Sequence, residues 1–230
     1  MGSIGSNLQE VKRRIASACA EAGRDAHGVT LLAVSKTFSA EAVREAHAAG
    51  QREFGENYVQ EGLAKIEALA DLRAGLEWHL IGPLQSNKTR PVAETFDWVH
   101  SVERLKIAER LAAQRPASLP PLQVCLQVNI SGETSKSGLA PGEVVAVARL
   151  VAALDPRRLM LRGLMAIPEP AGDVAAQREP HRALRELLGA VNDQGLALDT
   201  LSIGMSTDLE AAILEGATLV RVGSAIFGSR

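Results

Sequence analysis

Short apolar segments alternate with longer amphipathic segments along most of the chain, and this alternation limits the fold more than any other feature of the sequence. The apolar segments are rich in Leu, Val and Ile and have the length of strands that are buried on both faces. Eight of them occur, at residues 31–36, 52–57, 77–82, 97–102, 122–129, 161–167, 200–204 and 219–223. A helix is predicted after each of the first seven. This order predicts an α/β protein, a single-domain (β/α)8 TIM barrel.

The two ends of the sequence fit the same barrel. An apolar stripe from Leu8 to Ala18 predicts a helix over 4–22, before the first strand. The last predicted strand ends too close to Arg230 for a full eighth helix to follow it. We therefore expect the extra N-terminal helix to stand in for the final helix of the outer ring.

The bulk composition excludes several classes of protein. The 230 residues carry a formal charge of −2 with both signs mixed, so no basic surface for nucleic acid is expected. No apolar run is long enough to span a membrane, and no signal-peptide pattern is present. Cys19 and Cys125 form no disulfide framework, which is typical of a reducing cytoplasm. We expect one cytoplasmic, monomeric domain over 1–230, without a metal site.

The first predicted strand ends on a lysine. In the run Leu31-Leu32-Ala33-Val34-Ser35-Lys36-Thr37, side-chain alternation places Lys36 on the same face as Val34 and Leu32. Lys36 therefore stands at the C-terminal end of a buried strand, where barrels of this class carry their chemistry. The competing interpretation is a lysine whose ammonium group merely reaches water.

Two loops late in the chain have the composition of an anion site, because barrels often bind phosphate after strands seven and eight. Gly204-Met205-Ser206 precedes Thr207, which is predicted to open a helix as a capping box with Glu210. Gly223-Ser224-Ala225 follows the last strand and adds backbone N–H groups and a hydroxyl. Either loop alone could be an ordinary turn, but both together favour a phosphate site.

Arg221 lies inside the last predicted strand, between Val220 and Val222. If the valines face the helices, the guanidinium faces the barrel interior and needs an acceptor there. That acceptor is either a carboxylate such as Glu56 or a ligand at the mouth. The predicted mouth thus holds Lys36, Arg221 and a phosphate cradle. A lysine that forms a Schiff base and an anion cradle are what pyridoxal 5′-phosphate requires, since its aldehyde reacts with a lysine amine.

Seven longer motifs then occur in one order along the chain. They are Ala33–Thr37 (AVSKT), Phe54–Tyr58 (FGENY), Trp78–Lys88 (WHLIGPLQSNK), Ser135–Gly138 (SKSG), Leu161–Pro168 (LRGLMAIP), Leu201–Ser206 (LSIGMS) and Arg221–Gly228 (RVGSAIFG). Together they resemble the YggS/PROSC-type pyridoxal phosphate homeostasis proteins, single-domain relatives of the alanine racemase N-terminal barrel. The resemblance covers nearly the whole chain. The family pattern often has Thr where Ser224 stands, and the hydroxyl is kept.

The resemblance implies a set of cofactor-binding residues, which are Lys36, Asn57, Met165, Ser206, Arg221, Gly223 and Ser224. It implies that Lys36 carries the cofactor as a Schiff base and that Arg221 meets the pyridine nitrogen. Asn57 and Met165 are expected beside the ring, and the others at the phosphate. No catalytic residue is implied.

Two further residues keep two interpretations each. His79 is either a hydrogen-bonded histidine of the barrel interior or a residue of the site. Lys136 is either a solvated loop lysine or a secondary cofactor contact.

The resemblance also implies a role in intracellular homeostasis of pyridoxal phosphate (vitamin B6) and amino acids, with little or no turnover. An arginine at the pyridine nitrogen leaves that nitrogen unprotonated, which makes the ring a poorer electron sink. Tyr58 is the single tyrosine, and we expect it to be structural rather than the second base of a racemase. We expect a non-catalytic carrier, with PLP-dependent apo-enzymes as candidate partners. Two alternatives remain, a fold-type III amino-acid racemase of narrow specificity and a cofactor-free isomerase of sugar phosphates.

Overall fold

The computed structural model describes residues 2–132 and 137–228, so Lys136 lies outside the described residues. Within this part of the chain, eight parallel strands close into one barrel in sequence order, and β8 pairs with β1. The strands are β1 Thr30–Val34, β2 Glu53–Glu56, β3 Glu77–Leu80, β4 Trp98–Val102, β5 Leu122–Gln127, β6 Leu159–Met165, β7 Thr200–Ser202 and β8 Leu219–Val222. The predicted TIM barrel is confirmed.

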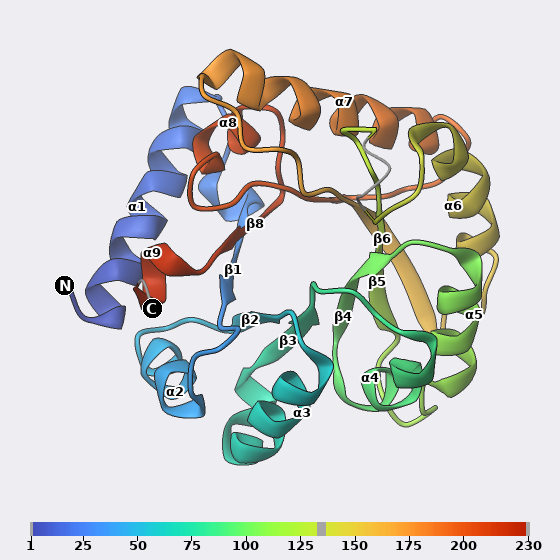
Figure 1. Ribbon diagram of the computed structural model, residues 1–230, viewed down its shortest axis with the longest axis horizontal. Coiled ribbons are helices and arrows are strands. Elements are labelled where there is room, and N and C mark those ends of the chain that lie inside the picture. Colours follow the sequence, from blue (N-terminus) through green and yellow to red (C-terminus); the bar gives the residue numbers. More distant parts are fainter. Residues whose placement is uncertain (1, 133–136, 229–230) are drawn as a thin grey trace.

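Helices form an outer ring around the strands (Figure 1). They are α1 Ile4–Glu21, α2 Ala40–Ala48, α3 Val59–Ala68, α4 Thr89–Thr95, α5 Leu105–Gln114, α6 Val144–Ala152, α7 Val174–Asn192, α8 Leu209–Leu214 and α9 Ser224–Phe227. None of the described helices is both long and apolar enough to cross a membrane.

Alternation along β1 divides its side chains between two layers of the core. Leu31 and Ala33 belong to the large apolar cluster between the strands and the helices. Leu32 and Val34 belong to a separate interior cluster with Ile81 and others. Because successive side chains of a strand point to opposite faces, the interior face of β1 continues toward the position of Lys36.

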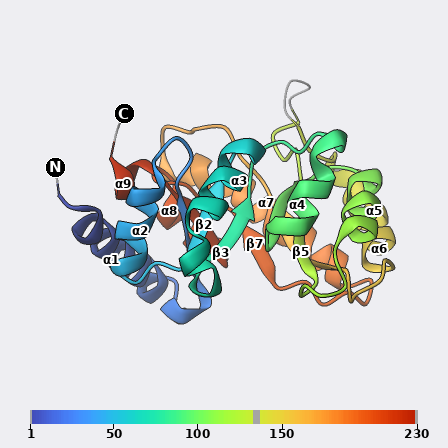
Figure 2. The same ribbon diagram turned by 90° about the horizontal axis from the view of Figure 1, so that it is seen from below.

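The N-terminal helix α1 fills the place of a missing eighth outer helix, as expected. The helix that follows β8, α9, has only four residues. α1 packs against both α8 and α9, and they lie together in both views (Figures 1 and 2). The contact includes a hydrogen bond of 2.9 Å from Asn7 Nδ2 to the carbonyl of Ile226. An ion pair of 2.7 Å joins Arg14 to Glu210.

Five strands end two residues before the predicted positions. They are β1, β3, β5, β6 and β7, which end at Val34, Leu80, Gln127, Met165 and Ser202. The apolar and small residues that follow them leave the hydrogen-bonded ladder and form the loops of the mouth. An apolar pattern therefore overstates strand length where a loop is itself lined by apolar side chains.

The sequence of the helix after β6 contains Pro180, where a break is expected, but α7 runs through this proline without interruption. A proline inside a helix leaves the carbonyl of the residue four positions earlier without its usual partner. Here that residue is Ala176, which is exposed, so water can take the place of the lost N–H.

Candidate functional site

A pocket of about 450 Å³ opens at the C-terminal ends of the strands. Its volume is in the range of sites for small molecules and cofactors. The lining residues are Val34, Lys36, Phe38, Asn57, Ile81, Ile167, Met205, Ser206, Thr207, Arg221, Gly223, Ser224 and Gly228. The structure thus brings together six of the seven residues predicted for the site, and leaves out Met165.

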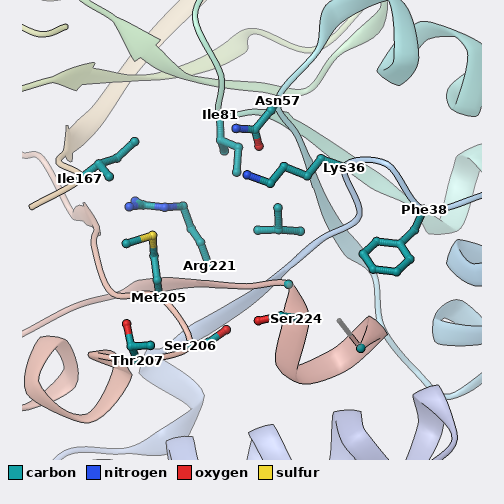
Figure 3. A pocket seen from close by; sticks show the side chains of 13 residues that line it. Lys36, Phe38, Asn57, Ile81, Ile167, Met205, Ser206, Thr207, Arg221 and Ser224 are labelled. Carbon is teal, nitrogen blue, oxygen red and sulfur yellow. The ribbon is translucent and has the colours of Figure 1, made fainter. Parts of the chain in front are cut away.

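Lys36 lies two residues beyond the end of β1 and is half-buried. Its side chain extends into the pocket, with Asn57 and Ile81 on the same side and Arg221 across from it (Figure 3). Among the described residues, its amine has no hydrogen-bond or ion-pair partner. A free amine that faces a pocket is available to a ligand.

The backbone on both sides of Lys36 is held by a buried polar network behind the strand. Lys65 Nζ donates to the carbonyl of Ser35 at 2.6 Å, to Glu56 Oε1 at 2.8 Å and to Glu61 Oε1 at 2.7 Å. Ser35 Oγ also donates to Glu56 Oε1, at 2.6 Å.

Glu61 accepts the backbone N–H of Thr37 as well. Thr37 has φ +66°, the one positive φ outside glycine in the described residues. The turn after β1 is therefore fixed in an uncommon conformation, which is a frequent property of functional sites.

Arg221 is 4 % exposed and points from β8 into the barrel interior, while its neighbours Val220 and Val222 pack toward the helices. Its NH1 donates to the carbonyl of Ser202 at 2.5 Å and to Ser202 Oγ at 2.8 Å, and its NH2 donates to the carbonyl of Ala166 at 2.8 Å. Burial lowers the pKa of the guanidinium to about 10, so it is charged at neutral pH.

The alternative in which Arg221 pairs with Glu56 is wrong. Glu56 lies in the network behind β1, where Lys65 and Ser35 are its partners. Burial is the largest influence on the Glu56 carboxyl and raises its pKa, and the bonds from Lys65 and Ser35 oppose that rise. Arg221 instead uses two backbone carbonyls and one hydroxyl.

Hydroxyl groups and small residues form the opposite wall of the pocket. Ser206, Thr207 and Ser224 lie there, away from Lys36 and Asn57 (Figure 3). At Gly223 a Cβ would come within 3.1 Å of the Val34 carbonyl, so a glycine lets the loop pass close to β1. Such a wall of hydroxyls and backbone N–H groups suits an anion.

The loop after β7 is anchored from two sides. Arg14 of α1 donates from NH2 to the carbonyl of Ser206 at 3.0 Å. Asp208 Oδ1 accepts the backbone N–H of Met205 at 2.7 Å, and its Oδ2 lies 3.0 Å from His181 Nε2. These contacts hold the wall from behind and leave the Ser206 hydroxyl toward the pocket.

The predicted capping box between Thr207 and Glu210 is wrong. The residue before α8 is Asp208, which makes no side-chain cap bond, and Glu210 pairs with Arg14. Because Glu210 pairs with Arg14 of α1, its side chain is not available for a local helix cap. Thr207 lines the pocket instead.

Met165 was expected beside the cofactor ring, but it lies one layer of side chains below the pocket. It is the last residue of β6, fully buried, and clusters with Trp98 and Cys125. It faces the barrel interior, but Ile167, two residues later on the same face, is the one that reaches the pocket.

Several lining residues were not predicted for the site. They are Val34, Phe38, Ile81, Ile167, Met205, Thr207 and Gly228. Ile81, Ile167 and Met205 each follow the end of a strand, so strand ends alone could have indicated them. Phe38 is different, since it stacks on Phe227 with ring centroids 5.0 Å apart, a contact that no local pattern predicts.

His79 is a histidine of the barrel interior, the first of its two interpretations. It is 1 % exposed, its Nδ1 lies 2.9 Å from His100 Nε2, and its ring stacks on Trp98. It does not line the pocket.

Comparisons with known proteins identify the family of this chain. The family model described as alanine racemase, N-terminal domain, matches residues 6–230. The pyridoxal phosphate homeostasis protein of Pseudomonas aeruginosa is 63 % identical over 100 % of this chain and 97 % of its own length. The chain belongs to the pyridoxal phosphate homeostasis protein family. The member from Escherichia coli K12 is 53 % identical, over 100 % of this chain and 98 % of its own.

Solved structures show the same barrel fold. PipY of Synechococcus elongatus, solved with PLP bound, superposes with a TM-score of 0.84 at 37 % identity, over 98 % of this chain and 100 % of its own. The alanine racemase of Corynebacterium glutamicum has a TM-score of 0.69 at 18 % identity, over 97 % of this chain but 59 % of the racemase. The second likeness shows the fold alone.

Proposed function

We propose that this protein binds pyridoxal 5′-phosphate at the mouth of its barrel and acts in the homeostasis of that cofactor and of amino acids. One observation carries the proposal. The amine of Lys36, without a partner in the described residues, faces a pocket whose opposite wall is built from Ser206, Ser224 and Gly223. A primary amine and an anion wall across one pocket match the two ends of this cofactor.

The polar groups of the pocket fit the cofactor in a further respect. Asn57 Oδ1 is buried and has no hydrogen-bond partner within the described residues. Buried polar atoms are rarely left unsatisfied, so a ligand or a water molecule is expected beside it. A pyridine ring with a hydroxyl group brings a suitable donor to that wall.

When bound, pyridoxal 5′-phosphate supplies an aldehyde that reacts with primary amines. Lys36 provides the amine, and the network of Lys65, Glu56 and Glu61 keeps its backbone in place. Arg221 donates hydrogen bonds and keeps its own proton, because its pKa of about 10 lies far above neutral pH. Ser206 and Ser224 provide hydroxyl groups for the phosphate.

Little or no turnover is part of the proposal. Among the described residues that line the pocket, the ionisable side chains are Lys36 and Arg221, and neither is a carboxylate, histidine or tyrosine. Tyr58 is 58 % exposed and lies outside the lining. Racemisation needs a base on each face of the substrate, and the pocket offers no second one. A racemase would convert amino-acid enantiomers at about 1 per second or faster; polarimetry should detect no such conversion.

The test uses absorbance and covalent labelling. Purified protein is mixed with pyridoxal 5′-phosphate, its spectrum is recorded before and after borohydride, and the labelled peptide is mapped. We expect a long-wavelength band that borohydride removes and a label on Lys36. Lys36→Arg keeps the charge but removes the primary amine, so it should lose band and label completely.

The matched control is Lys106→Arg, because Lys106 is exposed on α5 and outside the pocket. It should keep the band of the unmodified protein. A label on another lysine, or a band that survives in Lys36→Arg, would contradict the role proposed for Lys36. The absence of any band would favour a phosphate-binding protein without this cofactor.

We also propose that the protein is a cytoplasmic monomer that passes its cofactor to PLP-dependent apo-enzymes. The position of Lys36 in a pocket open to solvent supports exchange with such partners. Recovery of activity by an apo-enzyme, measured with loaded protein separated from it by a dialysis membrane and without one, distinguishes direct transfer from simple release.

A further inference from the structure

A chain of hydrogen-bonding side chains crosses the barrel interior below the pocket. It begins at Arg221, whose NH1 lies 2.8 Å from Ser202 Oγ. Ser202 Oγ lies 2.7 Å from His100 Nδ1, and His100 Nε2 lies 2.9 Å from His79 Nδ1. Ser202, His100 and His79 are each at most 1 % exposed, so water does not compete along the chain.

The far end of this chain reaches a second cavity at the opposite mouth of the barrel. His79 and Glu77 both line that cavity. His79 Nε2 has no hydrogen-bond partner among the described residues, and it lies 3.8 Å from Glu77 Oε1. The chain of hydrogen bonds therefore runs from Arg221, which lines the upper pocket, to His79 at the lower end, where the carboxylate of Glu77 lies nearby.

Both histidines of the chain are neutral. Burial lowers the pKa of His79 to about 3 and that of His100 well below its ordinary value. Each neutral imidazole carries one N–H and one acceptor nitrogen, so the chain can run in two directions. The direction follows from which groups would be left unsatisfied.

In the first direction, the Ser202 hydroxyl donates to His100 Nδ1, and His100 Nε2–H donates to His79 Nδ1. His79 then directs its Nε2–H toward the carboxylate of Glu77. In the reverse direction, the Ser202 hydroxyl has no acceptor along the chain, and a lone pair of His79 faces the carboxylate. A buried donor without an acceptor is costly, so the first direction is the stable one.

We infer that Ser202, His100 and His79 form a polarised relay that positions Arg221 in the cofactor pocket. Because the Ser202 hydroxyl donates its hydrogen bond to His100 Nδ1, the oxygen of Ser202 is free to accept from Arg221. The three are positioning residues, since the lining of the pocket includes none of them. Their effect on the cofactor rests on the proposed function, whereas the relay itself is a property of the protein alone.

The first test measures tautomers without any cofactor. Two-dimensional NMR of protein labelled with ¹⁵N in its histidines distinguishes Nδ1–H from Nε2–H in each ring. We expect the Nε2–H form for both His79 and His100. An Nδ1–H form or a charged ring at either position would overturn the relay. His47 of α2, remote from the barrel interior, is the internal control.

The second test removes the hydroxyl that joins Arg221 to the histidines. Ser202→Ala should leave His100 as a mixture of tautomers and weaken the binding of pyridoxal 5′-phosphate about tenfold, the scale of one hydrogen bond to a charged group. Ser202→Thr keeps the hydroxyl and should keep both the tautomer and the affinity within about twofold. The His47 signals should not change in either variant.

A double-mutant cycle separates a relay from simple packing. His100→Phe keeps a ring of similar size but cannot hydrogen-bond, and it should weaken binding as much as Ser202→Ala. Since both changes break the same relay, the double variant should be no weaker than either single variant. Losses that add would overturn the inference. If the unmodified protein did not bind the cofactor, the proposed function would fail while the tautomer result stood.

Discussion

Two lysines lie close to the end of β1, and their surroundings are opposite. Lys65, behind the strand, is 6 % exposed and donates to three oxygens, those of Ser35, Glu56 and Glu61. Lys36, in front of the strand, faces the pocket and has no partner within the described chain. The ammonium group of Lys65 therefore has a structural role, whereas the amine of Lys36 is available to a ligand.

This difference shows how the fold leaves one amine available to a ligand. A buried ammonium needs compensating acceptors, and the Lys65 network supplies them within a few residues of Lys36. Glu56 Oε1 and Glu61 Oε1 both accept from Lys65, and Glu61 also accepts the N–H of Thr37. Lys36 is thus held by its backbone, while its amine is left to a ligand.

The largest effect on stability is expected when Lys65, the paired lysine, is replaced. Lys65→Met leaves the fully buried carboxylate of Glu56 without its positive partner. The free energy of unfolding should fall by about 3 kcal/mol, because an unpaired buried charge is strongly destabilising. Urea unfolding measures the loss.

The double variant Lys65→Met/Glu56→Leu provides the control. When both charges are replaced by apolar side chains of similar size, most of the penalty disappears. We expect it to recover more than half of the lost stability. If Lys65→Met alone were as stable as the unmodified protein, the network would not be the structural element described.

A smaller effect is expected from loosening the opposite wall of the pocket. Arg14→Ala removes the support of the Ser206 carbonyl and the ion pair with Glu210. Since that pair is partly exposed, the loss of stability should be about 1 kcal/mol. Affinity for pyridoxal 5′-phosphate should fall about threefold, because the anion wall is no longer preorganised.

Arg13→Ala is the matched change on the same helix. Arg13 is exposed and contacts only Glu10, within α1, among the described residues. It should alter neither stability nor affinity measurably. Equal effects of the two substitutions would show that the charge of α1, rather than the contact to Ser206, matters. Calorimetric titration and thermal unfolding provide the two readings.

A pH-dependent effect is expected from a half-buried carboxylate that lies beside another carboxylate, at the other end of the barrel. Burial, and then the neighbouring Glu77, raise the pKa of Glu53 to about 7. In the unfolded chain a glutamate has a pKa of about 4.3. The folded protein therefore binds this proton more tightly, and the resulting stability is present below about pH 4.3 and is lost as the pH rises to 7.

Glu53→Gln should accordingly flatten the fall in melting temperature between about pH 5 and 7, by a few degrees at most. Glu67→Gln, an exposed carboxylate of α3, serves as control and should leave the slope unchanged. A slope that persists in Glu53→Gln would assign the pH dependence to another group. The result would contrast Glu53, which lies beside another carboxylate, with Lys65, whose ammonium group donates to three oxygens.

Much of the fold and part of the site could be predicted from the sequence, because both depend on local periodicity. Alternating strands and helices indicated the barrel, and the two-residue period of a strand placed Arg221 on an interior face. The length of each strand was less accessible, since Gly204 and Ile167 continue an apolar pattern beyond the ladder. Met165, which was expected beside the cofactor ring, lies one layer of side chains below the pocket.

The sequence by itself determined the order of strands and helices and which residues share a strand face, since these follow from chain geometry over a few residues. Only the tertiary structure decided the partners. In the folded chain, the partner of Arg221 is Ser202 rather than Glu56. Glu210 pairs with Arg14 instead of capping a helix. These choices depend on how closed strands and outer helices meet in space, and contacts between residues nearly two hundred positions apart leave no local pattern in the chain.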